Sequence, residues 1–169
     1  QNKYAEGYPG RRYYGGNEII DQIENLCIER ALKLFGLKEK DWHVNCQAHS
    51  GSPANLAVYL ANVPVGTGKI MGMSLDQGGH LTHGFKASVT GKWWNQVPYG
   101  VDKKTETLDY KKIQAIAAAE KPELIVAGFT AYPRIVDWKQ FKKIADAAGK
   151  LDFANAIPAE LMTQAMQDP

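Results

Sequence analysis

The chain has 169 residues, of which 44% are hydrophobic, and its formal net charge at pH 7 is +2. This length and composition predict one soluble globular domain, and the balanced charge gives no reason to expect a nucleic-acid-binding protein. The two cysteines, Cys27 and Cys46, are too few for a disulfide framework and favour a reducing compartment. No apolar run approaches the ~18 residues that a membrane-spanning helix needs.

The first 35 residues divide into an irregular segment and a helix. Residues 1–16 are rich in tyrosine and glycine, a composition that excludes a regular helix. Residues 17–35 place apolar side chains three and four positions apart, which predicts an amphipathic helix with Asn17 as its N-cap and Gly36 beyond its end. Cys27 falls on the apolar stripe, so we expect it to pack in the core.

The next stretch predicts a short strand followed by an anion-binding turn. Residues 42–46 alternate as a strand does. Pro53 precedes a run of helix formers and suits the first helical position, which makes Ser52 the natural N-cap. Gly51 would let a ligand approach the backbone, and free amides with the helix dipole favour phosphate. An ordinary capped helix is the alternative.

Residues 70–84 read as a strand and a glycine-rich loop with two histidines. Residues 70–73 are apolar, and a turn over residues 76–79 precedes His80 and His83. Three interpretations stay open. The pair could ligate a metal with Asp76, one ring could stack on a flat cofactor or move protons, or both could satisfy hydrogen bonds in the loop.

The remaining elements alternate between strands and helices. Residues 93–98 favour a strand, residues 109–119 a helix capped by Asp109, and residues 137–148 a helix ended by Gly149. The continuous apolar run 124–127 is typical of a strand that is buried on both faces of a parallel sheet. This alternation predicts an α/β fold with a mainly parallel sheet, whose ligands lie beyond the carboxyl ends of the strands.

Several stretches, taken together and in order, resemble the serine hydroxymethyltransferase family. The matching segments are residues 2–16, 49–55, 78–84, 98–101 and 127–134, and the similarity runs from about residue 2 to about residue 149. The resemblance implies the large domain of a fold-type I, aspartate aminotransferase-like, pyridoxal 5′-phosphate-dependent transferase. It also implies the interconversion of serine and glycine, with tetrahydrofolate as the one-carbon carrier.

The resemblance divides the chain into three parts and assigns roles to individual residues. Residues 1–16 form an interface segment with active-site residues, 17–149 a partial cofactor-binding domain, and 150–169 an unmatched tail. The cofactor-binding residues that it implies are Tyr4, Ser50, Gly51, Ser52, Asn55, His80 and Thr130. The catalytic residues that it implies are Glu6, Tyr14, His80 and Thr130, while Leu75 and Gly79 line the folate pocket and no metal is expected.

These roles have a common logic in the family. The resemblance implies that Ser50, Gly51 and Ser52 would hold the phosphate, that His80 would stack on the cofactor ring, and that Thr130 and Asn55 would touch its ring oxygen. It also implies that Tyr4, Glu6 and Tyr14 would act across a homodimer interface on the neighbour's site.

After Gly149 the sequence departs from the family pattern. Residues 151–153 only faintly match the family's buried strand, which ends in an aspartate. None of the lysines has the context of the Schiff-base lysine, so we expect a truncated, inactive fragment. The alternative is a non-catalytic module that dimerises and binds phosphate.

Expected partners are a second copy or a full-length subunit, with serine, glycine and tetrahydrofolate as ligands, but neither nucleic acid nor a membrane. The expected location is the cytoplasm, with an organellar form as the alternative.

Overall fold

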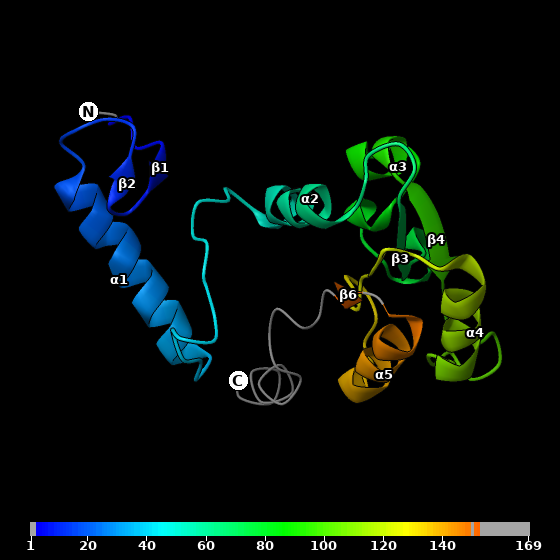
Figure 1. The fold of residues 1–169 in the computed structure, drawn as a ribbon. Coiled ribbons are helices and arrows are strands. Elements are labelled where there is room, and N and C mark those ends of the chain that lie inside the picture. The colour runs from blue at the N-terminus through cyan, green and yellow to red at the C-terminus, as the bar shows by residue number, and fades with distance from the viewer. Residues whose placement is uncertain (1–2, 150, 153–169) are drawn as a thin grey trace. The chain divides into compact units, whose positions relative to one another are not determined.

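The computed structural model describes residues 3–149 and 151–152 (Figure 1). The chain divides into two compact units, Gln1–His49 and Ser50–Pro169. Most of the tail that we expected to be unmatched, residues 153–169, lies outside the described residues.

The first unit pairs a small hairpin with one long helix. Strands β1 (Gly7–Tyr8) and β2 (Arg11–Arg12) are antiparallel. Helix α1 (Glu18–Leu34) begins after Asn17 and is followed by Gly36, whose φ is +62°, so both predicted ends of this helix are confirmed. The predicted strand over residues 42–46 is wrong, because these residues pair with none of the described strands.

The expected core role of Cys27 is also wrong within this unit. Cys27 is exposed, as is its stripe neighbour Ile23, and Leu32 is the one buried side chain of α1. The hairpin contacts α1 through Arg12, which binds Asp21 and Glu24. Ion pairs therefore help to hold the hairpin on α1.

The second unit contains a parallel sheet, which confirms the predicted α/β fold. Its strands lie in the order β4-β3-β5-β6, and each neighbouring pair is parallel. The strands are β3 (Lys69–Met73), β4 (Asn95–Tyr99), β5 (Leu124–Ile125) and β6 (Leu151–Asp152). The helices are α2 (Gly51–Asn62), α3 (Val89–Trp93), α4 (Tyr110–Glu120) and α5 (Trp138–Ala148), with two 3₁₀ turns, η1 (Leu75–Gln77) and η2 (Leu81–His83).

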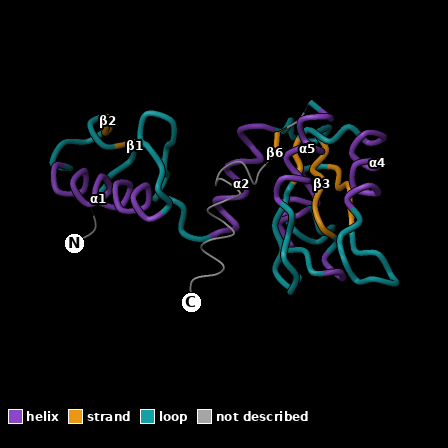
Figure 2. The backbone as a smooth tube through the Cα atoms, turned by 90° about the horizontal axis from the view of Figure 1, so that it is seen from below, coloured by secondary structure: helices purple, strands orange, loops and turns teal. Residues whose placement is uncertain are grey.

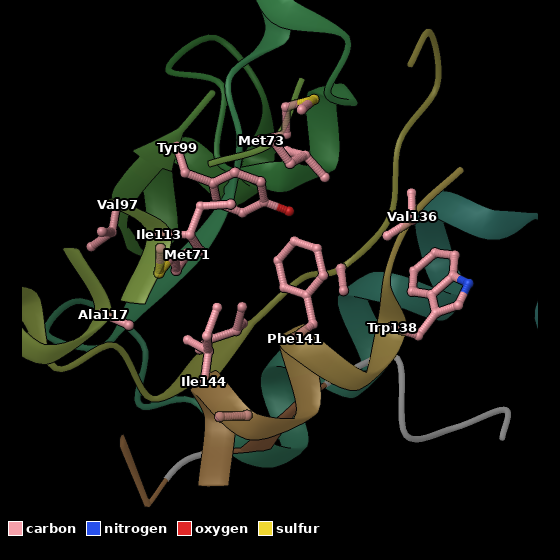
Figure 3. Packing of buried hydrophobic residues seen from close by; sticks show 14 residues of the cluster. Met71, Met73, Val97, Tyr99, Ile113, Ala117, Val136, Trp138, Phe141 and Ile144 are labelled. Atoms are coloured by element: carbon pink, nitrogen blue, oxygen red, sulfur yellow. The ribbon is translucent and has the colours of Figure 1, made fainter. Parts of the chain in front are cut away.

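The sheet is covered on both faces, as the apolar run 124–127 predicted. Figure 2 shows α2 on one side of β3 and α4 on the other. On the α4 and α5 side, Met71 and Ile125 join a buried cluster with Phe141, which points from α5 toward Tyr99 in Figure 3. The alternate residues of the same strands face α2 and form a second buried cluster: Ile70, Leu124 and Val126 with Tyr59, Val63 and Trp94. Side chains alternate between faces along each strand, so both faces of the run must be apolar.

Several element boundaries differ from the sequence expectation, and β5 is shorter than the predicted strand 124–127 because it ends at Ile125. Helix α2 begins at Gly51 with Ser50 as its N-cap, two residues before the predicted start. Pro53 fits at the third helical position because the first amides of a helix have no partner inside it. The aromatic segment 93–98 is also divided, since Trp93 ends α3 and the strand begins at Asn95.

The caps Asp109 and Asp137 are confirmed, each accepting amide hydrogen bonds from the following turn. Among the described residues, no helix combines the length and apolarity needed to cross a membrane.

Candidate functional site

The loop that follows β3 is the centre of the candidate site. It contains η1, two glycines and η2, and it places Leu75, Gly79 and His80 within six residues of one another. Gly78 has a φ of +112°, and a side chain on Gly79 would collide with the Met73 carbonyl oxygen. Both positions therefore require glycine, which is why the loop folds back over the carboxyl end of its own strand.

His80 is held by a hydrogen-bond network that reaches α2. The Thr82 amide donates to His80 Nδ1 at 3.1 Å, and the Thr82 hydroxyl lies 2.9 Å from the same atom. Asn55 Nδ2, in the second turn of α2, donates to the Thr82 hydroxyl at 2.9 Å. The structure thus brings Asn55 and His80 together, although they lie 25 positions apart in the sequence.

His83 is buried, and its environment keeps the ring neutral. Burial is the main reason that the pKa of His83 is lowered to about 4, and the nearby His80 lowers it further. A hydrogen bond with the Met73 backbone opposes this shift. Its Nδ1 accepts a hydrogen bond of 3.1 Å from the His80 amide. Of the three interpretations of the histidine pair, the one in which the ring satisfies hydrogen bonds within the loop fits His83.

The third member of the metal interpretation, Asp76, has a different partner. Its carboxylate accepts a hydrogen bond from the Ser74 hydroxyl. Across residues 3–149 and 151–152, no three His, Cys, Asp or Glu side chains are grouped to hold a metal ion.

Thr130 reaches the same loop from β5. The amides of Thr130 and Ala131 both donate to the Gly78 carbonyl oxygen, at 2.9 and 3.1 Å. The Thr130 side chain remains exposed. The carboxyl ends of the parallel strands β3 and β5 therefore meet at one place, as the fold rule for open α/β sheets predicts.

The start of α2 has the donors that a phosphate group needs. The Ser50 side chain makes no capping hydrogen bond, and the space around the Gly51 α-carbon is open. The amides of Gly51 and Ser52 belong to the first turn, where a helix offers them no partner, and the helix dipole adds positive potential. Ser50, Gly51 and Ser52 are exposed, so this turn can accept an anionic group such as a phosphate.

The remaining candidate residues lie in the first unit. The rings of Tyr4 and Tyr14 have centroids 6.0 Å apart, and both side chains are exposed. Glu6 is tied to this region through its carbonyl oxygen, which accepts a hydrogen bond of 3.2 Å from the Tyr13 amide. The structure thus gathers Tyr4 and Tyr14, with Glu6 in the same folded segment.

Sequence reasoning missed the residue that folds this segment, Arg12. Its guanidinium binds Asp21 at 2.8 Å and Glu24 at 3.0 Å, and it also donates to the carbonyl oxygens of Ala5 at 2.6 Å and Gly7 at 3.1 Å. One signal could have found it, because Asp21 and Glu24 are three positions apart and share one face of α1.

Comparisons with known proteins agree on one family. A family model described as serine hydroxymethyltransferase matches residues 1–159. A serine hydroxymethyltransferase of Alcanivorax borkumensis is 54% identical over 150 residues, which are 89% of this chain and 35% of that protein. The serine hydroxymethyltransferase of Coprothermobacter proteolyticus is 55% identical with the same coverage. A probable serine hydroxymethyltransferase of Rickettsia bellii is 54% identical over 148 residues, 88% of this chain and 34% of that protein. The chain spans about a third of the length of these curated relatives.

Proposed function

The chain belongs to the serine hydroxymethyltransferase family, and we propose that its Ser50–Pro169 unit supplies phosphate and ring contacts to a pyridoxal-phosphate site. In this proposal the site interconverts serine and glycine, with tetrahydrofolate as the carrier of the one-carbon unit. Such a site belongs to a fold-type I transferase domain, of which this chain holds part.

One observation carries the proposal. Three segments that are distant in the sequence meet at the carboxyl ends of β3 and β5. Asn55 of α2 bonds to Thr82, Thr82 bonds to His80, and the Thr130 amide bonds to Gly78 of the same loop. A phosphate-binding helix start, a ring with its Nδ1 atom engaged, and an exposed hydroxyl then belong to one site.

Each residue has a task that its surroundings support. Ser50, Gly51 and Ser52 bind the phosphate through hydroxyls and amides, and this orients the cofactor. His80 offers a flat, half-buried ring for stacking. The Thr130 hydroxyl donates to or accepts from the ring oxygen. Leu75 and Gly79 would line the folate pocket on the same loop.

The bound cofactor would supply an electron sink for the bonds of the substrate α-carbon. The residues of the first unit would complete a neighbouring site in a dimer. Glu6 would hold or move a proton there, and Tyr4 and Tyr14 would contact the phosphate and line the pocket. The exposure of both tyrosine rings leaves them available for such contacts.

A titration with pyridoxal phosphate, followed by absorbance, tests the proposal. We expect saturable binding by the unaltered chain. Ser52→Glu places a negative charge at the helix start and should weaken binding at least about tenfold by charge repulsion. Thr67→Glu is the matched control, because Thr67 is exposed and precedes the amino end of β3, the opposite end of the strand. Binding that does not saturate, or equal loss in both variants, contradicts the proposal.

Borohydride reduction and intact mass then decide whether the binding is covalent. No lysine of this chain has the sequence context of the family's Schiff-base lysine, so we expect no stoichiometric adduct of pyridoxal phosphate on a lysine. A single modified lysine would instead show that another lysine has taken that role.

A further inference from the structure

The Thr82 side chain links α2 to the His80 ring. It is 9% exposed and lies in η2 between His80 and His83. Its hydroxyl receives a hydrogen bond from Asn55 and lies 2.9 Å from His80 Nδ1. Tyr59, a fully buried residue of α2, lies close to the Thr82 side chain.

The direction of these hydrogen bonds defines the state of the His80 ring. An amide can only donate, so the Thr82 amide makes His80 Nδ1 an acceptor. A neutral imidazole with an accepting Nδ1 carries its proton on Nε2. The Thr82 hydroxyl can accept from Asn55 and donate its own proton to His80 Nδ1, which reinforces the same tautomer.

The network also restrains the orientation of the ring. Asn55 and Tyr59 belong to α2, whereas Thr82 and His80 belong to the loop after β3. Two groups of Thr82 bind His80 Nδ1, and α2 anchors Thr82 through Asn55. The His80 ring therefore loses freedom to rotate. Within the described residues, no hydrogen bond engages His80 Nε2, which leaves that atom and the ring faces for a ligand.

We propose that Thr82, anchored by Asn55, is a positioning residue that fixes the tautomer and orientation of the His80 ring. The consequence for stacking on a cofactor rests on the proposed function, but the effect on the ring itself does not. In this view Asn55 acts on the His80 ring through Thr82.

Nitrogen-15 NMR of the histidine side chains in the unliganded chain tests the first part. The signals of His80 are assigned by comparison with His80→Gln. In the unaltered chain we expect separate resonances for a protonated Nε2 and an accepting Nδ1. Thr82→Val removes the hydroxyl but keeps the amide donor, so it should move the two His80 resonances part of the way toward each other, whereas Thr82→Ser keeps the hydroxyl and should restore the separation.

Thr90→Val is the matched control for a purely structural effect. Thr90 is also a buried threonine, 3% exposed, but it lies in α3 outside the network. We expect it to leave the His80 resonances unchanged. Unchanged resonances in Thr82→Val, or equal changes in Thr82→Val and Thr90→Val, would overturn the proposal.

A second arm measures ligand binding and separates this inference from the proposed function. Thr82→Val should weaken pyridoxal phosphate binding about tenfold, equivalent to one lost hydrogen bond. Binding of inorganic phosphate should change less than about twofold, because the helix start is untouched. If the unaltered chain binds no pyridoxal phosphate, the proposed function fails, while the NMR result still decides the role of Thr82.

Discussion

The buried His83 should make the stability of the Ser50–Pro169 unit sensitive to mild acid. Burial and the neighbouring His80 lower the pKa of His83 from its ordinary 6.5 to about 4. The unfolded chain therefore binds a proton at a pH where the folded chain does not. Stability is fully present above about pH 6.5 and is lost as the pH falls toward 4.

The size of this loss follows from the same two pKa values. Each pH unit between them is worth about 1.4 kcal/mol, so the full window from 6.5 to 4 corresponds to about 3 kcal/mol. A small domain is stable by only about 5–15 kcal/mol, so this one ring is a large fraction of the total.

Urea unfolding at a series of pH values between 7.5 and 4.5 measures the effect, with the buried Trp94 and Trp138 as fluorescent reporters. His83→Asn removes the titrating ring and retains an acceptor for the His80 amide, so its free energy of unfolding should fall less steeply with acid. The exposed His43, replaced by Asn, controls for the loss of a histidine elsewhere. If the unaltered chain and His83→Asn lose the same stability over this range, the reasoning is refuted.

Three further predictions concern packing and local structure, each measured as the free energy of unfolding in urea. Phe141→Ala empties a fully buried site and should destabilise by about 3–5 kcal/mol, whereas Ile135→Ala, at an 86% exposed position, should change stability by less than about 0.5 kcal/mol. Asp137→Ala removes the cap of α5 and should lower stability by about 1 kcal/mol; an unchanged value would show that the cap is dispensable. Gly79→Ala forces a Cβ into a carbonyl oxygen of β3 and should destabilise by about 1–3 kcal/mol, unlike Gly51→Ala, where the space is open; equal effects would contradict the close approach.

Much of the secondary structure could be read from local patterns. The α1 boundaries, the capping aspartates Asp109 and Asp137, and the buried strand that begins at Leu124 all follow from residue types within a few positions. Such features depend on backbone propensity and hydrogen bonds inside one segment, so the sequence contains the relevant information. The start of α2 was misplaced by two residues because Ser50 and Ser52 are both acceptable caps.

Parts of the candidate site could also be predicted from local patterns, whereas other predictions failed. The phosphate-binding turn and the glycine loop were visible as strings, since glycine is required wherever the backbone has a positive φ or a close neighbour, as at Gly78 and Gly79. The strand predicted over residues 42–46 failed because a strand needs a partner, and alternation alone does not provide one.

By itself, the sequence determined the family, the order of the helices and most strands, and the residue types of the site. Only the tertiary structure decided which of those residues act together. It joined Asn55 and Thr82 to His80, and it placed Arg12 between Asp21 and Glu24. The physical reason is that these contacts depend on the three-dimensional approach of separate segments, whose geometry arises from the packing of α2 on the sheet and of the hairpin on α1.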